Sequence, residues 1–472
     1  MKRSIGKKVL LISPPYERTI YRESKVRAGI PANPPASLPT LAAPLLDAGH
    51  GVQTLDLNVA TEPVLALEET VRAYRPEYVG ITFTTPLFDE MKAISEMVKQ
   101  IDPNMVTLAG GPHASAMPEQ TLQDSSLDMV VVGEGDFVLP KIVAGEAPER
   151  LPGVCYKHDG TVHRSSLNGY IRDLDVLPFP KWELYDMGRY RNPRLSSRRN
   201  PVVSLESSRG CVYGCTFCNK STFGRTFRVK SPERVVDEVE HMLRIGFQEV
   251  QFLDDGFTTN LDRAKEICAE IMRRGLRFPW CPRIGVRVDR VDREVLRMMR
   301  EAGCYRVNFG IESGNQEIID GIKKGITLDQ VRRAVRWANE VGLETFGYFM
   351  IGLPGETEEN LQETIDFALS LNLDYVKAAV TIPLPGTPLY DEWEGEGLLK
   401  GQEWWKYNFS TSARDLYDHP KLSWDTIEAY YAKFHRAFYL RPGYMVKRLK
   451  LGLVNGNILY DAYYFLRTKW GR

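Results

Sequence analysis

Short apolar segments alternate with longer amphipathic segments along most of this chain. The apolar segments are rich in β-branched residues and are typical of strands, whereas the segments between them repeat apolar residues at helical spacing. Such alternation predicts an α/β protein with parallel sheets and helical crossovers. The pattern falls into two regular parts, separated at 141–200 by a stretch with many Pro, Arg and Ser residues and little periodicity.

The first regular part predicts a doubly wound sheet. Ligands of such sheets bind beyond the carboxyl ends of the strands. The predicted strands are 8–13, 52–57, 78–83, 105–109 and 129–132, with helices at 38–48, 64–74 and 87–101.

The second part predicts consecutive β/α units that close into a partial barrel. Right-handed crossovers favour this closure, and active-site residues are then expected at the carboxyl ends of the strands. The predicted strands are 202–206, 249–253, 280–286, 306–311, 345–351 and 375–382, with helices at 232–245, 261–274, 293–302, 328–341 and 358–371.

Four segments follow from this division: a sheet domain at 1–140, a linker at 141–200, a barrel at 201–390 and an α-rich, aromatic region at 391–472. The aromatic side chains of the last segment have two interpretations. They form either one wall of an apolar substrate pocket or the core of a small helical domain.

Charge and cysteine content narrow the class of protein. Lys plus Arg equals Asp plus Glu at 61 each, so no global charge attracts nucleic acid. The seven cysteines are an odd number, which fits a reducing compartment better than a disulfide scaffold. The first apolar run is too short for a signal peptide, and no apolar run is long enough to span a bilayer. We therefore expect a cytoplasmic enzyme.

Three cysteines follow the first barrel strand, where active-site residues are expected. Cys211, Cys215 and Cys218 form a C-x3-C-x2-C run. Iron–sulfur clusters are held by cysteine thiolates, usually four, so three ligands leave one iron of a 4Fe-4S cluster open. A zinc site would need a fourth Cys or His nearby, and three unrelated buried cysteines are the other alternative.

The cysteine run, with Tyr213 and Phe217 between its ligands, resembles that of radical S-adenosylmethionine (SAM) enzymes. The resemblance implies that Cys211, Cys215 and Cys218 hold a 4Fe-4S cluster. It also implies that the open iron chelates SAM, which the cluster cleaves reductively to a 5′-deoxyadenosyl radical.

Other strand ends resemble SAM contacts of that superfamily, in family order. Asp254 and Asp255 occupy the place of the motif that receives the SAM amino group; because neighbouring strand residues point to opposite faces, we favour Asp255. Arg287 resembles the SAM-carboxylate arginine, for which Arg283 competes. The remaining implied contacts are Glu312 at the ribose and the segment from Tyr348 to Gly352 at the adenine. For Arg287 and Glu312 the structural alternative is a salt bridge across the barrel rim. For the segment from Tyr348 to Gly352 it is a plain strand-to-helix turn.

The first part resembles the cobalamin-binding domain of the cobalamin-dependent branch. The resemblance implies a flavodoxin-like or Rossmann-like domain ahead of the radical SAM barrel. Glycines at strand ends allow the backbone to approach a flat macrocycle closely. The implied cobalamin contacts are Pro15, Thr84, Thr85, Gly110, Gly111, His113, Gly133, Glu134 and Gly135.

One feature departs from classical cobalamin domains, which supply an axial histidine from a D-x-H-x-x-G motif. That motif is absent, and His113 lies in a Gly-Gly-Pro-His run instead. We therefore expect a corrinoid without a histidine ligand, with His113 hydrogen-bonding or facing the corrin. A loop histidine without a cofactor role, or a domain that has lost the corrinoid, are the alternatives.

The resulting hypothesis is a cobalamin-dependent radical SAM enzyme that modifies an unactivated carbon, with methyl transfer from methylcobalamin favoured. Radical cyclisation, rearrangement or oxidation of an apolar or natural-product substrate is the first alternative, and a non-catalytic corrinoid or electron-transfer protein is the second. Expected partners are a small molecule that is lipid-like, terpenoid or tetrapyrrole, and an electron donor such as flavodoxin or ferredoxin. Nucleic acid is not expected. The basic and apolar segment at 444–453 suggests peripheral membrane contact.

Overall fold

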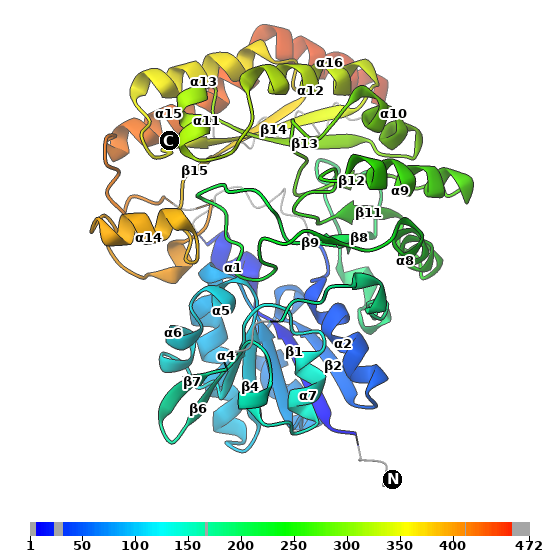
Figure 1. Ribbon diagram of the computed structural model, residues 1–472, viewed down its shortest axis with the longest axis vertical. Coiled ribbons are helices and arrows are strands. Elements are labelled where there is room, and N and C mark those ends of the chain that lie inside the picture. Colours follow the sequence, from blue (N-terminus) through cyan, green and yellow to red (C-terminus); the bar gives the residue numbers. More distant parts are fainter. Residues whose placement is uncertain (1–5, 23–31, 166–168, 411, 456–472) are drawn as a thin grey trace.

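The structure is a computed structural model that describes residues 6–22, 32–165, 169–410 and 412–455. A sheet domain occupies the lower half of Figure 1, and a strongly curved array of strands and helices arches above it. Helix α1 (Tyr16–Ile20) belongs to the lower domain and lies at the open side of the arch. The two halves therefore face each other across their strand ends and loops.

The lower domain is built on a seven-stranded sheet with the order β2-β1-β3-β4-β5-β6-β7. Strands β1 to β5 pair in parallel in the flavodoxin-like order, which confirms the predicted doubly wound sheet. These strands are β1 (Lys8–Ser13), β2 (Gly51–Asp56), β3 (Tyr78–Thr82), β4 (Val106–Gly110) and β5 (Met129–Val131). The helices after α1 are α2 (Ser37–Asp47), α3 (Pro63–Tyr74), α4 (Phe88–Ile101), α5 (Pro112–Ala116), α6 (Pro118–Gln123) and α7 (Val138–Val143).

Two antiparallel strands from the segment after residue 140 extend this sheet. Strand β6 (Val154–His158) pairs with β5, and β7 (Thr161–Arg164) pairs with β6. The hairpin turns at Asp159 and Gly160, which both have positive φ. Asp-Gly is the preferred pair for such a turn, because both central residues need left-handed backbone. The segment predicted as a linker thus contributes strands to the first sheet.

The upper half contains the six strands of the predicted partial barrel. They form two parallel sheets, β12-β11-β8 and β13-β14-β15, joined by parallel bridges between Trp280 and Cys304 and between Val286 and Phe309. The barrel strands are β8 (Val202–Leu205), β11 (Glu249–Phe252), β12 (Trp280–Pro282), β13 (Arg306–Glu312), β14 (Glu344–Ile351) and β15 (Tyr375–Val380). A two-residue pair, β9 (Ser208–Arg209) with β10 (Arg228–Val229), frames the cysteine segment.

Each barrel helix begins at a residue that caps its first turn. Ser231 accepts a hydrogen bond from the Arg234 amide with Pro232 as the first helical residue, and Thr327 and Thr357 form capping boxes. These caps fix where the strand-to-helix loops end, and those loops carry the candidate site. The helices are α8 (Pro232–Arg244), α9 (Leu261–Arg273), α10 (Arg293–Glu301), α11 (Gln316–Gly321), α12 (Leu328–Glu340) and α13 (Glu358–Ser370).

The last described helices are α14 (Pro388–Gly395), α15 (Trp424–Tyr439) and α16 (Pro442–Asn455); residues 456–472 of the predicted C-terminal region lie outside the described residues. Helix α15 packs beside the last strand, and the Tyr439 hydroxyl bonds both the amide and the carbonyl of Val376. This contact satisfies backbone groups at the edge of the sheet. Among the described helices, none is both long and apolar enough to cross a membrane.

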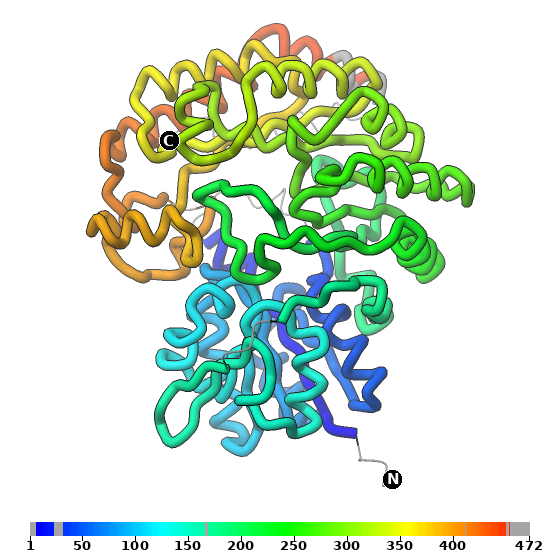
Figure 2. The backbone as a smooth tube through the Cα atoms, viewed as in Figure 1, coloured from blue at the N-terminus to red at the C-terminus, as the bar shows by residue number. Residues whose placement is uncertain are grey.

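The aromatic residues of the C-terminal region mostly form packing contacts. The rings of Trp393, Tyr417 and Trp424 contact one another in series, tilted and edge-on, and are buried. The chain then returns to the lower domain, as the orange part of the tube beside the cyan helices in Figure 2 shows. There Trp404 lies against Phe88 and His113. The region therefore fastens the two halves together.

Candidate functional site

The three cysteines lie in an irregular loop that leaves β9 at the mouth of the barrel. Gly210, directly before Cys211, has φ of +82°, and a Cβ there would lie 2.3 Å from the Thr226 carbonyl oxygen. Glycine is thus required for the loop to turn. The Cys218 amide donates to the Cys215 carbonyl at 3.4 Å, and the Thr216 amide donates to the Ile322 carbonyl at 3.1 Å.

The thiols lie near one another but do not converge on one point. Burial raises the pKa of Cys218 to about 11, and Cys215 and Cys211 add to this rise. Among the described residues no group of three His, Cys, Asp or Glu side chains is placed to hold a single metal ion. In a cluster each cysteine binds a different iron, so spaced thiolates suit a 4Fe-4S centre better than a zinc ion.

The two predicted aspartates have different surroundings. Asp254 is buried and accepts hydrogen bonds from the Ser207 amide and from the Ser207 and Ser208 hydroxyls, so it braces the turn before the cysteine loop. Asp255 is exposed, and its charge raises the pKa of Cys218. The structure therefore brings Asp255, and not Asp254, to the open side of the cysteine loop.

Arg287 and Glu312 also lie around the cysteine loop. The Arg287 guanidinium lies 3.5 Å from the ring centre of Tyr213 and donates to Asp289 at 2.9 Å. Glu312 has left-handed backbone with φ of +70° and accepts a hydrogen bond from Lys324 at 2.5 Å. Lys324 was not predicted; its ammonium is 5.9 Å from the Phe217 ring, and its place in a Lys-Lys-Gly turn after α11 was the available signal.

The predicted segment from Tyr348 to Gly352 ends β14. Tyr348 points to the inner face of the barrel, where its hydroxyl lies 3.5 Å from the Asn308 amide nitrogen. Gly352 begins the turn with φ of +79°, and its amide donates to the buried Glu356 carboxyl at 2.7 Å. Glu356, which sequence reasoning did not select, also accepts the Leu353 amide at 2.8 Å. This carboxyl therefore holds the turn in shape.

Burial raises the pKa of Glu356 to about 8, although the two amides oppose the shift. A raised pKa in the folded state means that the contribution of Glu356 to stability is fully present below about pH 4.5 and is lost as pH rises through about 8. The free energy of unfolding should therefore fall with rising pH by up to about 1.4 kcal/mol per pH unit because of Glu356, and we expect Glu356→Gln to remove this fall. Thermal unfolding at pH 5.5 and 7.5 tests this, with the surface variant Glu396→Gln as control; an unchanged pH dependence would contradict it.

A large cavity, here called the interdomain cavity, lies between the carboxyl ends of β1, β3 and β4 and the barrel segment from Ser204 to Arg209. Its empty volume, including space that is open to solvent, is about 1240 Å³. One part is lined by Leu11, Leu41 and Leu108, and the rim carries glycine backbone. An apolar cavity with a glycine rim fits a large, flat cofactor with an attached tail.

The structure brings part of the predicted cobalamin set to this cavity. Its lining contains Gly110, Gly111, Gly133, Glu134 and Gly135. The lining does not contain Pro15, Thr84, Thr85 and His113. His113 is fully buried; its Nδ1 lies 3.2 Å from the Thr85 hydroxyl, and its ring packs against aromatic side chains. Burial lowers its pKa to about 4, so the imidazole is neutral.

Gly111 lies at the cavity rim and directly precedes α5, with φ of +105°. A Cβ there would lie 2.6 Å from the Phe83 carbonyl oxygen, whereas a Cβ on Gly110 would meet the Val131 carbonyl oxygen at an ordinary 3.5 Å. We expect Gly111→Ala to cost about 1–3 kcal/mol of stability and to weaken cobalamin binding, while Gly110→Ala folds normally. Equal unfolding midpoints for the two variants, measured by differential scanning calorimetry, would contradict this.

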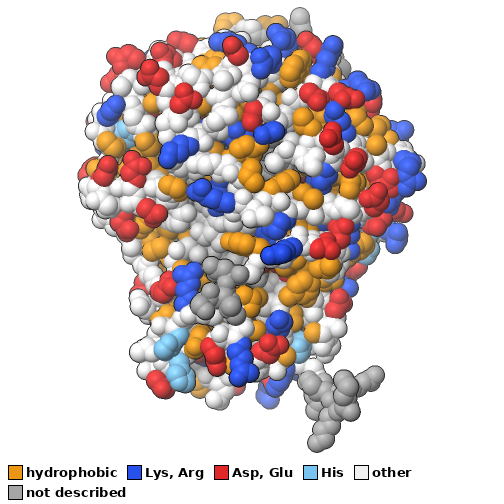
Figure 3. Space-filling model, viewed as in Figure 1, with side chains coloured by type: hydrophobic (Ala, Val, Ile, Leu, Met, Phe, Trp, Pro, Cys, Tyr) orange, Lys and Arg blue, Asp and Glu red, His pale blue; other side chains and the backbone are white. Residues whose placement is uncertain are grey.

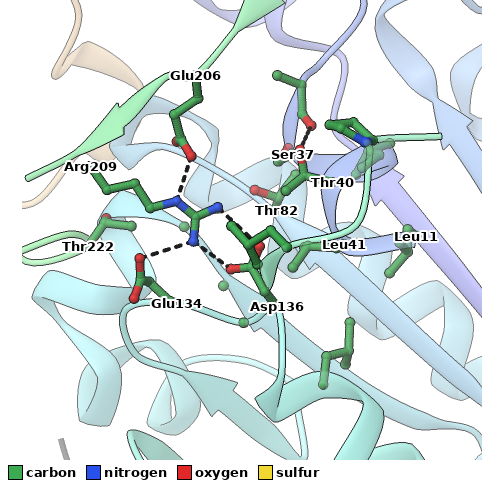
Figure 4. Close-up of a pocket in the computed structure, with 18 of the residues that line it drawn as sticks. Leu11, Ser37, Thr40, Leu41, Thr82, Glu134, Asp136, Glu206, Arg209 and Thr222 are labelled. Atoms are coloured by element: carbon green, nitrogen blue, oxygen red, sulfur yellow. Dashed lines mark hydrogen bonds and ion pairs between the residues drawn. The ribbon is translucent and has the colours of Figure 1, made fainter. Parts of the chain in front are cut away.

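An ion-pair network spans the polar end of the cavity and was not predicted. Arg209 is 3% exposed and lies two residues before Cys211. It donates to Asp136 at 2.8 and 3.0 Å, to Glu134 at 3.0 Å and to Glu206 at 2.5 Å (Figure 4). Arg228 holds the other side of Glu134 at 2.8 Å. The loop of the sheet domain and the cysteine segment are thus joined by buried charges.

Comparison with known proteins matches two parts of the chain to known families. Residues 32–143 match the B12 binding domain family, and residues 205–368 match the radical SAM superfamily. An uncharacterised methyltransferase of Pyrococcus horikoshii is 32% identical over 96% of this chain and 99% of its own length. An anaerobic magnesium-protoporphyrin IX monomethyl ester cyclase of Rubrivivax gelatinosus is 29% identical over 87% of this chain and 75% of its own length.

Among solved structures, the radical SAM methyltransferase TsrM of Kitasatospora setae, with cobalamin and a [4Fe-4S] cluster bound, is similar in fold. Its TM-score is 0.69 at 22% identity, over 83% of this chain and 78% of that chain. Fold and site define a radical SAM enzyme with a cobalamin domain ahead of its barrel. The chain belongs to the cobalamin-dependent radical SAM enzyme family. The cofactors of that family are a 4Fe-4S cluster, SAM and cobalamin.

Proposed function

We propose that the enzyme transfers a methyl group from methylcobalamin to an unactivated carbon of a small molecule. This proposal is carried by the position of the interdomain cavity, which reaches Arg209, two residues from the first predicted cluster cysteine. When bound, the cluster and SAM supply a 5′-deoxyadenosyl radical, and cobalamin supplies the methyl group. A cavity that ends beside the cysteine loop allows both to act on one substrate atom without release.

The roles of individual residues are part of this proposal. Cys211, Cys215 and Cys218 hold the cluster. Asp255 receives the SAM amino group, since Asp254 is already bound to two serines. Arg287 and Glu312 orient the carboxylate and the ribose, with Lys324 neutralising Glu312.

The turn after β14 supports the proposed adenine site, and the glycine rim of the interdomain cavity supports the proposed cobalamin site. The turn from Tyr348 to Gly352 is kept open by Glu356 and would receive the adenine. Backbone at Gly110, Gly111, Gly133 and Gly135 would face the corrin. Glu134 would act through the two arginines that it binds.

The experiment is a product analysis on enzyme reconstituted anaerobically with iron, sulfide and hydroxocobalamin. After reduction with dithionite in the presence of SAM and a cell extract, we expect both 5′-deoxyadenosine and S-adenosylhomocysteine. Deoxyadenosine without S-adenosylhomocysteine would favour radical cyclisation, which the resemblance to the magnesium-protoporphyrin ester cyclase makes the second candidate. If neither 5′-deoxyadenosine nor S-adenosylhomocysteine formed, the proposed enzymatic role would be contradicted.

The proposal includes two protein-level contacts. A flavodoxin or ferredoxin would deliver the electron to the cluster.

The second contact is with a membrane surface. It is supported by the exposed apolar residues of α16 beside Lys447 and Arg448, which are Met445, Val446, Leu449 and Leu453. Flotation with anionic liposomes tests this contact; protein found only in the soluble fraction would remove it. Acidic and basic side chains are interspersed on the face in Figure 3, which offers no single-sign surface to nucleic acid.

A further inference from the structure

Two cationic side chains, those of Arg283 and Lys377, face the interior of the barrel. Lys377 pairs in register with Tyr348, and paired residues of parallel strands point to the same face. That face is the inner one, because the next residue, Phe349, packs outward against Phe434 of α15. Lys377 is nevertheless exposed, so open space lies in front of it.

Arg283 approaches the same space from the opposite wall. It follows β12 directly; its amide donates to the Phe252 carbonyl at 2.8 Å, and its carbonyl accepts from Asn308 at 2.8 Å. The Asn308 amide also lies 3.5 Å from the Tyr348 hydroxyl. Arg283, Asn308 and Tyr348 therefore line one continuous inner surface that ends at Lys377.

Neither cation has a counter-ion among the described residues. In the part of the chain that the structure describes, Arg283 and Lys377 form no ion pair, and no side-chain hydrogen bond of either is present. Two other cations of the barrel are paired: Arg306 binds Glu344 at 3.0 Å and Lys324 binds Glu312 at 2.5 Å. Arg283 is half-buried and Lys377 is exposed, so both remain accessible, and an interior surface that carries two like charges attracts an anion from outside.

The electrostatics agree with two like charges facing each other. Burial lowers the pKa of Lys377, and the Arg283 charge lowers it further. Burial lowers the pKa of His435 on α15, and the Lys377 charge lowers it further. Arg283 also opposes the burial-driven rise in the pKa of Tyr16 and Tyr21 of the sheet domain. The guanidinium thus lies where the barrel meets α1.

A carboxylate of α1 lies close to this space. Glu17 of α1 influences Tyr16 and Tyr21 but forms no ion pair with Arg283 in the described residues. The Tyr348 hydroxyl and the Asn308 amide on the inner surface are groups that can donate hydrogen bonds to an oxyanion. Helix α1, which adjoins Arg283, belongs to the sheet domain and lies at the open side of the arch (Figure 1).

We propose that Arg283 and Lys377 bind an oxyanion group, a carboxylate or a phosphoryl group, on the substrate of this enzyme. The inference rests on the proposed function, because it places the substrate between the cobalamin domain and the cluster. A guanidinium offers a planar, two-point contact to an oxyanion, and an ammonium on the opposite wall fixes the second side. This assigns Arg283 to the substrate rather than to the SAM carboxylate.

The test is isothermal titration calorimetry on enzyme loaded with cluster and cobalamin, oxidised and saturated with SAM, so that the SAM site is filled and no turnover occurs. The probes are methylphosphonate and acetate. We expect one equivalent of at least one probe to bind, and Arg283→Gln and Lys377→Gln each to weaken its binding at least tenfold. Lys141→Gln, an exposed lysine on α7, is the control. Absence of binding to the unmodified enzyme, or equal binding to all variants, overturns the inference.

A second readout separates binding from a structural role. Because Lys377 repels Arg283, Lys377→Gln should raise the thermal unfolding midpoint while it weakens binding, and Lys377→Glu, which supplies an internal counter-ion, should raise it further and abolish binding. A fall in midpoint for both variants would overturn the inference. S-adenosylhomocysteine and deoxyadenosine are measured on the same preparations: products without probe binding contradict only this inference, and probe binding without products contradicts only the proposed function.

Discussion

Replacing Cys218 with alanine is expected to reduce bound iron from about four per chain to near zero and to lower deoxyadenosine formation at least a hundredfold. With two of three thiolates left, the loop cannot hold the cluster, and reductive cleavage of SAM requires it. Iron content, the visible spectrum and product formation after dithionite reduction measure this. The loop lies at the barrel mouth, and among the described residues the Cys218 thiol forms one long hydrogen bond, to the Asn219 carbonyl at 3.8 Å, so the fold should survive.

The matched control is Cys268→Ala. Cys268 is fully buried on α9, and burial raises the pKa of its thiol to about 12, so it behaves as a small apolar core residue. We expect this variant to keep its iron and its activity at a small cost in stability. If it lost iron as Cys218→Ala does, the assignment of the cluster to the loop would be wrong.

Strands and helices could be predicted because their signals are local. Each barrel helix has a cap residue and a periodic apolar face, and each strand is a short apolar run, so the barrel elements fall within a few residues of their predicted ranges. The hairpin of β6 and β7 was read as linker because its strands are short and half polar. The Asp159-Gly160 pair was its one strong signal.

The site could be predicted only where the chemistry lies in consecutive residues. The cysteine spacing is local and was sufficient to predict the radical SAM family. Arg209 was missed because its partners Glu134 and Asp136 lie more than 70 residues away, and a lone arginine in sequence carries no mark of its burial. His113 illustrates the converse: its motif suggested a place at the cofactor, but Trp404, from the far end of the chain, packs on its ring.

The second large effect is expected for Arg209→Met. The substitution keeps much of the side-chain volume but leaves the carboxylates of Glu134 and Asp136 buried, with Arg228 as the remaining cation beside Glu134. Removing one partner of a buried ion pair costs about 3–5 kcal/mol, because the other charge stays out of water. We expect a loss of this size in denaturant unfolding. Arg414→Met, which breaks surface pairs with Asp425 and Glu428, should cost less than about 1 kcal/mol.

A charge-balanced variant shows whether the network does more than stabilise. In Arg209→Met with Asp136→Asn and Glu206→Gln, the uncompensated charges are removed, so most of the lost stability should return. Cobalamin binding should remain weakened, because the loop of Gly133 to Asp136 is no longer tied to the strand that leads to Cys211. Equilibrium dialysis with hydroxocobalamin measures this. Full recovery of binding with recovered stability would mean that the network acts on the fold alone; weak binding in a stable protein would show that Arg209 positions the cobalamin loop against the cluster loop.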